Sequence, residues 1–216
     1  MSRRLPIYLV LDTSGSMDGA PINAVNQGLQ VFQNALKADP RALETAFVSV
    51  ITFCADAEQV VPLTDIQSFT CPPLTAGGTT AFGAGLRLLE ECIRREVVAT
   101  TTTTQKGDWK PLAFVFTDGQ PTDSWETAAE SLKNKRICNI IGCAAGDAAD
   151  VQMLKKLSET VVKLSDTNEQ SVSAFFKWVT QSVKVASASV GTGPANPNQP
   201  INLPPPPPNA GIVIVP

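Results

Sequence analysis

Hydrophobic positions along the chain follow two alternating patterns. Short apolar runs rich in β-branched residues, bounded by turn-forming residues, are typical of strands buried on both faces of a sheet. Between these runs, apolar residues recur every three or four positions, which predicts amphipathic helices. The runs predict strands over residues 5–11, 45–54, 58–63, 112–117, 137–143 and 161–164, and the wider spacing predicts helices over residues 21–38, 82–97, 125–132, 150–157 and 172–183.

This alternation of strands and helices predicts an α/β fold. Consecutive parallel strands need a helical crossover, and such crossovers cover both faces of the sheet. We therefore predict a Rossmann-like, doubly wound, mostly parallel sheet. Residues 58–63 follow the preceding strand too closely for a crossover. They are predicted to return as a hairpin and to form one antiparallel edge strand.

The C-terminal segment differs in composition from the rest. Residues 185–216 contain no charged residue and 9 of the 17 prolines, including the run Pro204–Pro208. Such a run is typical of a polyproline II spacer. It is followed by GIVIVP, which has high β-propensity. We predict an α/β domain over residues 1–187 and a proline-rich tail over 188–216, whose last residues add a strand to a sheet edge of this chain or of another.

Composition excludes several classes of function. The 216 residues suffice for one domain, and a net charge of −3 gives no general attraction to nucleic acid or to an anionic membrane. Histidine is absent, which excludes Ser-His-Asp and Cys-His catalysis and zinc sites that need imidazole. The first apolar stretch ends at Asp12, so it is too short for a signal peptide or a membrane span.

Cysteine usage suggests a reducing environment. The number of cysteines is odd and no CxxC pair occurs, so a full disulfide framework or a four-cysteine zinc site is not expected. Together with the lack of a targeting signal, this predicts free thiols in a cytoplasmic protein. The five cysteines are Cys54, Cys71, Cys92, Cys138 and Cys143.

Three short polar motifs follow predicted strands or precede a predicted helix. Asp12, Ser14 and Ser16 come directly after the first strand, residues 77–80 (GGTT) precede a helix, and Asp118 follows the strand over 112–117. In a parallel α/β sheet these positions meet near the carboxyl ends of the strands, where such folds place ligand sites. Carboxylates and hydroxyls together form an all-oxygen site. Such a site suits Mg²⁺ first, and Mn²⁺ or Ca²⁺ next.

The spacing within DTSGS has a physical reason. In an extended loop, positions i, i+2 and i+4 face one side, so Asp12, Ser14 and Ser16 can point at one ion. Gly15 lets the backbone curl around that ion. Two neutral hydroxyls and few carboxylates leave the cation electrophilic. The pattern therefore indicates a site that accepts a further carboxylate from outside.

In this order and context, DTSGS, GGTT and TDG resemble the von Willebrand factor A domain with its metal-ion-dependent adhesion site. The resemblance covers residues 5–187. It implies that Asp12, Ser14 and Ser16 supply the first metal-binding loop and that Asp118 supplies the third, often through water. It also implies that a Glu or Asp of a partner protein occupies the open coordination position.

Two threonines remain alternatives for the second loop. Family members commonly have a glycine five residues after the metal-binding threonine, and Thr80 with Gly85 fits this spacing. Thr79 is the more literal match to the GGT motif. We favour Thr80 and keep Thr79 as the alternative.

More narrowly, the opening RRLPIYLVLDTSGSM and the LPPPPP segment resemble the A-domain proteins of bacterial tellurite-resistance and stress-response operons. This resemblance implies a non-enzymatic interaction module, in systems that pair such a protein with a kinase and a phosphatase. One alternative is a Mg²⁺-dependent phosphoryl-transfer enzyme similar to the haloacid-dehalogenase phosphatases. Those need an acidic residue where this chain has Ser14, and a later acidic pair where Asp118 precedes Gly119. A second alternative is a metal-free scaffold.

Overall fold

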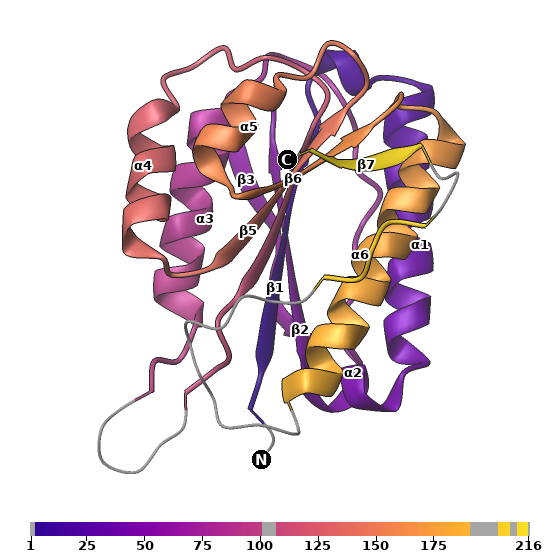
Figure 1. Cartoon of the computed structure of the whole chain (residues 1–216), viewed down its shortest axis with the longest axis vertical. Helices are drawn as coiled ribbons and strands as arrows, with labels where there is room; N and C mark the ends of the chain where they lie inside the picture. The colour runs from indigo at the N-terminus through magenta and orange to yellow at the C-terminus, as the bar shows by residue number, and fades with distance from the viewer. Residues whose placement is uncertain (1–2, 101–106, 191–202, 208–210, 216) are drawn as a thin grey trace.

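In the described part of the chain, seven β-strands form one sheet with helices on both of its faces (Figure 1). The computed structural model describes residues 3–100, 107–190, 203–207 and 211–215. The strand order is β3-β2-β1-β4-β5-β6-β7, with β1, β2, β4, β5 and β6 parallel. The α/β class and the doubly wound, mostly parallel sheet are thus confirmed. The strands are β1 (Leu5–Asp12), β2 (Ala46–Phe53), β3 (Ala57–Asp65), β4 (Leu112–Thr117), β5 (Asn139–Ala145), β6 (Thr160–Leu164) and β7 (Ile212–Val215).

Strand β1 lies in the interior of the sheet, between β2 and β4, and is buried along its whole length. Its side chains alternate between two apolar cores. Ile7 and Leu9 pack into the core under helices α1 (Ala20–Lys37), α2 (Pro40–Thr45) and α6 (Glu169–Val190). Tyr8 and Val10 pack into the core under α3 (Phe82–Glu96), α4 (Glu126–Lys135) and α5 (Val151–Leu157). Figure 1 shows these two groups of helices on opposite sides of the sheet.

Two helical segments differ from the sequence pattern. The pattern predicts no helix over residues 40–45, where the structure has α2. Pro40 begins this helix, and the Asp39 carboxylate accepts hydrogen bonds from the backbone N–H groups of Arg41 and Ala42. The Asp-Pro pair that ends α1 therefore also starts a new helix. Helix α6 continues beyond its predicted end at residue 183, because Ala186 still packs into the core.

The C-terminal segment returns to the sheet of its own chain. Strand β7 pairs antiparallel with β6, from Leu164 opposite Ile212 to Val161 opposite Val215. The sheet therefore has two antiparallel edge strands: β3, as predicted, and β7, which the tail adds at the other edge. The Trp178 indole N–H donates a 2.8 Å hydrogen bond to the carbonyl of Pro204, which fixes the described part of the proline run against α6. The run's last residue, 208, lies outside the described residues.

All five cysteines are free. Burial raises the pKa of the Cys71 and Cys92 thiols to about 11 and that of the Cys138 thiol to about 12. Cys143 is fully buried, and this raises its pKa as well. Since the thiolate is the reactive form, these four thiols are poor nucleophiles near neutral pH.

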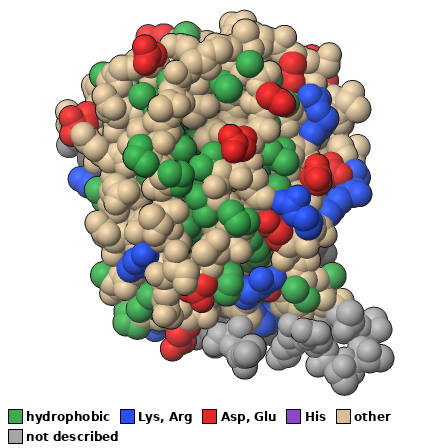
Figure 2. Space-filling view, turned by 180° about the vertical axis from the view of Figure 1, so that it is seen from behind, with side chains coloured by type: hydrophobic (Ala, Val, Ile, Leu, Met, Phe, Trp, Pro, Cys, Tyr) green, Lys and Arg blue, Asp and Glu red, His purple; other side chains and the backbone are tan. Residues whose placement is uncertain are grey.

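Among the described helices, none combines the length and the apolar character needed to cross a membrane. Figure 2 shows the face opposite to that of Figure 1, where Lys and Arg side chains are interspersed with Asp and Glu. This face therefore presents no field of a single sign, of the kind that attracts a nucleic acid backbone.

Alanine substitutions at neighbouring positions of β7 test whether this strand stabilises the domain. Ile212 is 7% exposed and packs into the core under α6, whereas Val213 is 63% exposed. Loss of the buried side chain in Ile212→Ala is expected to lower the free energy of unfolding by about 2 kcal/mol. Val213→Ala is the matched control, and its effect is expected to stay below about 0.5 kcal/mol. Urea unfolding measures the free energy of unfolding of both variants. Equal losses would show that packing of β7 against the core does not stabilise the domain.

Candidate metal site

The parallel pairing of β1 with β4 brings the first and third motifs together. Leu11 lies opposite Phe116 in this register, so Asp12 and Thr117 end neighbouring strands. The Thr117 hydroxyl donates a 2.6 Å hydrogen bond to Asp12 Oδ2. Asp118 follows directly and is also buried. Two carboxylates that are 106 positions apart in sequence thus meet at one end of the sheet.

Three oxygen atoms link the first loop to the third. Ser14 Oγ lies 3.1 Å from Ser16 Oγ, and the Ser16 hydroxyl donates a 2.7 Å hydrogen bond to Asp118 Oδ1. A single 3-10 turn over Gly15–Met17 carries Ser16, and the buried Met17 side chain anchors that turn in the core. Positions i+2 and i+4 of the motif, Ser14 and Ser16, therefore face the same point, as the spacing predicts.

Asp12 is completely buried, and its surroundings partly compensate its charge. Burial raises the pKa of its carboxyl, and the nearby charge of Asp118 adds to this rise. Hydrogen bonds from Ser14 and Thr117 act in the opposite direction, including a 2.8 Å bond from the Ser14 backbone N–H to Asp12 Oδ1. The ionised form of Asp12 is therefore disfavoured, which is the condition that a bound cation relieves.

Backbone hydrogen bonds hold the second loop against the first. The Gly77 N–H donates to the Thr13 carbonyl at 2.9 Å, and the Gly15 N–H donates to the Gly78 carbonyl at 3.0 Å. Gly78 has a φ of +79°, a conformation that L side chains rarely adopt, and a Cβ atom there would lie 3.2 Å from the backbone nitrogen of Ala55. The glycines of GGTT thus allow two loops to approach closely.

The two alternative threonines occupy different environments. Thr80 is buried, and Thr79 is exposed. A Cβ atom at Gly119 would lie 3.6 Å from Thr80 Oγ1 and 4.0 Å from Ser16 Oγ, so both hydroxyls lie beside the third loop. Of the residues predicted as ligands, Asp12, Ser14, Ser16, Thr80 and Asp118 are brought together at this end of the sheet.

Two residues that the sequence did not single out connect the second and third loops. The Thr80 N–H donates to Thr122 Oγ1 at 3.1 Å, and the Thr122 N–H donates to the Thr80 carbonyl at 2.9 Å. The Asp123 carboxylate accepts hydrogen bonds of 2.8 and 2.9 Å from the N–H groups of Gly83 and Ala84, in the first turn of α3. Asp123 therefore caps a helix that begins some 40 positions earlier, which no local sequence signal reveals.

The donor set fits a hard divalent cation. It consists of carboxylate and hydroxyl oxygens, and adjacent ligands of an octahedral Mg²⁺ lie about 3 Å apart, close to the separations seen among Ser14, Ser16 and Asp118. In the part of the chain that the structure describes, no group of three or more His, Cys, Asp or Glu side chains is placed to hold a metal. The site has two carboxylates only, and hydroxyls make up the rest.

Comparison with known proteins agrees with this fold. Residues 7–178 match the von Willebrand factor type A domain family, and the chain belongs to that family. No curated protein matches the chain by sequence. Members of the family commonly mediate metal-dependent protein interactions.

Solved structures share the fold at low sequence identity. A von Willebrand factor type A protein from Catenulispora acidiphila is 19% identical with a TM-score of 0.64, over 85% of this chain and 43% of that one. Proximal thread matrix protein 1 from the mussel byssus, with a zinc-occupied MIDAS motif, is 17% identical with a TM-score of 0.59, over 83% and 48%. BatB from Bacteroides thetaiotaomicron is 16% identical with a TM-score of 0.57, over 88% and 100%. The chain spans about half the length of the first two proteins.

Removing the Asp123 carboxylate tests the connection between the third loop and α3. Asp123→Ala leaves two N–H groups at the start of α3 without their acceptor, so the free energy of unfolding is expected to fall by about 1–2 kcal/mol. Asp147→Ala is the control, because the Asp147 side chain is 92% exposed and forms a surface ion pair with Lys163. Chemical unfolding measures both variants. If Asp123→Ala is no less stable than the control, the cap does not stabilise the loop.

Proposed function

We propose that the chain is a metal-dependent protein-interaction module that binds Mg²⁺ through Asp12, Ser14, Ser16, Thr80 and Asp118. The observation that carries this proposal is the row of oxygens from Ser14 through Ser16 to Asp118, at 3.1 and 2.7 Å. Family membership supports it, as does a solved relative whose MIDAS motif holds zinc. Mn²⁺ and Ca²⁺ are the alternatives to Mg²⁺ for this set of ligands.

Each residue has a distinct task in this proposal. Asp12 supplies negative charge from a buried position, and the hydrogen bonds from Ser14 and Thr117 fix its orientation. Ser14, Ser16 and Thr80 supply neutral oxygens. Asp118 is held through the Ser16 hydroxyl and contributes its charge from the third loop. A bound cation supplies Lewis acidity toward one further carboxylate.

A Glu or Asp side chain of a partner protein is the proposed occupant of that remaining position. A hard cation prefers oxygen ligands in a defined geometry, so a carboxylate would be both attracted and oriented. Ser16 is exposed, which places this side of the site within reach of a partner.

We propose that this module acts in a bacterial tellurite-resistance or stress-response system. The chain resembles the TerY proteins of such systems, and we propose that it acts in the cytoplasm. The support is the opening sequence RRLPIYLVLDTSGSM and the C-terminal proline run, which is followed by the short strand β7. A protein kinase and a phosphatase are the proposed partners in that system.

The competing proposal is a Mg²⁺-dependent phosphoryl-transfer enzyme. Ser14 and Gly119 stand where such an enzyme needs acidic residues, so we propose that the chain is not an enzyme. A generic phosphate monoester incubated with Mg²⁺ distinguishes the two. A metal-free scaffold, the remaining alternative, would show no stabilisation by Mg²⁺.

Neutralising Asp12 tests the metal site. Mg²⁺ at 100 times its Kd is expected to stabilise the wild type by about 2.7 kcal/mol through mass action. Asp12→Asn is expected to lose this stabilisation. Without metal, the same variant is expected to be at least as stable as the wild type, because burial raises the pKa of Asp12 and disfavours its charged form. Thermal unfolding with and without Mg²⁺ measures both effects.

The control for this experiment is Glu44→Ala, which removes an exposed carboxylate from α2, at the opposite ends of the strands from the candidate site, and is expected to keep the full Mg²⁺ effect. Capture of an acidic partner by the wild type should likewise require Mg²⁺ and Asp12. If Mg²⁺ raises the melting temperature of Asp12→Asn as much as that of the wild type, the assignment of the site is refuted.

A pair of valine substitutions separates the two threonines. Valine has nearly the shape of threonine but no hydroxyl, so Thr80→Val is expected to weaken Mg²⁺ binding at least about tenfold, which is about 1.4 kcal/mol. Thr79→Val is expected to leave binding unchanged, because Thr79 is exposed and Thr80 is buried beside Gly119. Mg²⁺ titration by calorimetry measures both, and the reverse ranking would make Thr79 the ligand.

A further inference from the structure

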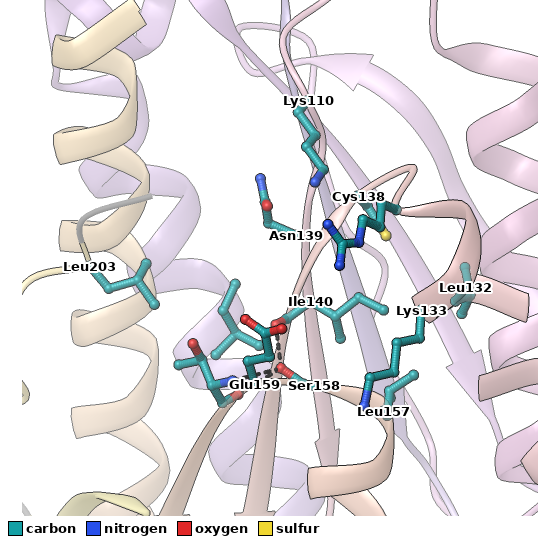
Figure 3. A pocket seen from close by; sticks show the side chains of 13 residues that line it. Lys110, Leu132, Lys133, Cys138, Asn139, Ile140, Leu157, Ser158, Glu159 and Leu203 are labelled. Carbon is teal, nitrogen blue, oxygen red and sulfur yellow. Dashed lines mark hydrogen bonds between the residues drawn. The ribbon is translucent and has the colours of Figure 1, made fainter. Parts of the chain in front are cut away.

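A second concave site lies at the opposite ends of the strands from the candidate metal site. The cavity has a volume of about 300 Å³ and is lined by residues that precede or begin β4, β5 and β6, such as Lys110, Asn139 and Thr160 (Figure 3). The end of α4 and the end of α5 complete its wall, and Leu203 of the C-terminal segment borders it. None of the residues proposed to bind metal contributes to this cavity, so it is independent of the proposed function.

The backbone at the end of α4 adopts a rare conformation at this cavity. Arg136 follows the helix with a φ of +48°, and it is the one non-glycine residue with a positive φ in the described part of the chain. Glycine is the usual residue at such a position, because L side chains are strained there. An arginine at a position where glycine is preferred, and which lines a cavity, points to a role for its side chain.

The cavity carries an excess of positive charge. Lys110, Lys133 and Arg136 line it, against a single carboxylate, Glu159. None of these three cations takes part in an ion pair within the described ranges. In Figure 3 the Lys110 side chain extends toward Cys138, on the other side of the cavity from Leu203. The local charge contrasts with the net charge of −3 of the whole chain.

The rest of the lining mixes polar residues such as Asn139 and Thr160 with apolar ones, and its accessible apolar surface comes from the half-buried Ile140 and Leu203. Leu132, Ile141 and Leu157 are almost fully buried and belong to the cores on the two faces of the sheet. Ser158 is also at the cavity, but its hydroxyl is already used, since it donates to the carbonyls of Ile140 and Thr160 and accepts from the Thr160 N–H. The Lys133 ammonium also has a partner, since it donates to the Lys156 carbonyl at 3.5 Å. The groups left to bind a ligand are therefore mainly Lys110, Arg136, the Asn139 amide and an apolar surface.

We propose that this cavity binds a small organic phosphate: a phosphate monoester with an apolar or aromatic body. A phosphate monoester is dianionic near neutral pH and matches two cations better than a single carboxylate does. The Arg136 guanidinium contacts two phosphate oxygens through its planar fork, and Lys110 adds a point charge. The apolar body packs toward Ile140 and Leu203, whose side chains are half-buried. A volume of about 300 Å³ is at the lower end for small-molecule sites, which limits the body to about one ring.

Phenyl phosphate is the probe for this proposal, with the full chain as the protein. Titration followed by calorimetry or by NMR is expected to show saturable binding, with a Kd in the range of about 0.1–1 mM. Inorganic phosphate lacks the apolar body, and benzoate carries one negative charge only, so both are expected to bind at least tenfold more weakly. Absence of phenyl phosphate binding up to about 10 mM would overturn the proposal. Equal binding of benzoate would overturn the assignment to a phosphate.

Arg136→Gly is the decisive variant, because glycine relieves the backbone strain and keeps the fold. It is expected to bind phenyl phosphate at least tenfold more weakly while its melting temperature stays the same or rises. Lys177→Ala removes an exposed positive charge from α6, away from the cavity, and is expected to bind like the wild type. Glu159→Gln removes the single carboxylate and is expected to bind more tightly. Unchanged binding in Arg136→Gly would overturn the proposal.

Discussion

The burial of one carboxylate at the end of the interior strand β1 constrains this molecule more than any other interaction. Asp12 has no exposed surface, and an ionised carboxylate in such a place is costly unless hydrogen bonds and charges compensate it. The Thr117 hydroxyl and the Ser14 backbone supply two of these compensations, one from the neighbouring strand and one from the loop that follows. A site for a cation is the natural completion of this arrangement, because a positive charge offsets both burial and the repulsion from Asp118.

The loops around Asp12 are fixed by backbone contacts as well as by side chains. Gly15 and Gly77 exchange hydrogen bonds with the neighbouring loop, and Thr122 holds the backbone of Thr80 on both sides. Asp123 then ties the same region to the first turn of α3. A ligand that shifted the second or third loop would therefore act directly on a helix of the domain. The site is preorganised because its supports are rigid elements and short hydrogen bonds.

The opposite ends of the strands have a different chemistry. There the sheet presents three cations that form no ion pair in the described ranges, together with a partly apolar lining and an arginine in a strained conformation. The described parts of the C-terminal segment, residues 203–207 and 211–215, lie against the domain. Leu203 borders the cavity, Pro204 accepts a hydrogen bond from Trp178, and Ile212 enters the core beside β6. The segment thus belongs to the structure of the domain where it is described, although its composition differs from that of the domain.

By itself, the sequence determined the fold class, the strands and most of the helices, and the three motifs of the candidate site, but not α2 or the full length of α6. Strand β1 and its neighbours are continuous apolar runs, and the helices have a clear apolar face, so local patterns suffice to identify them. What the tertiary structure decided depends on contacts between distant residues. The choice of Thr80 as the threonine beside the third loop, the cap that Asp123 provides to α3, and the pairing of β7 with β6 in the same chain are of this kind. Thr79 and Thr80 have the same chemistry and adjacent positions, so only the path of the loop distinguishes them. The hydrogen bonds of Asp123 and the edge that β7 joins are likewise set by packing, which spacing along the chain does not encode.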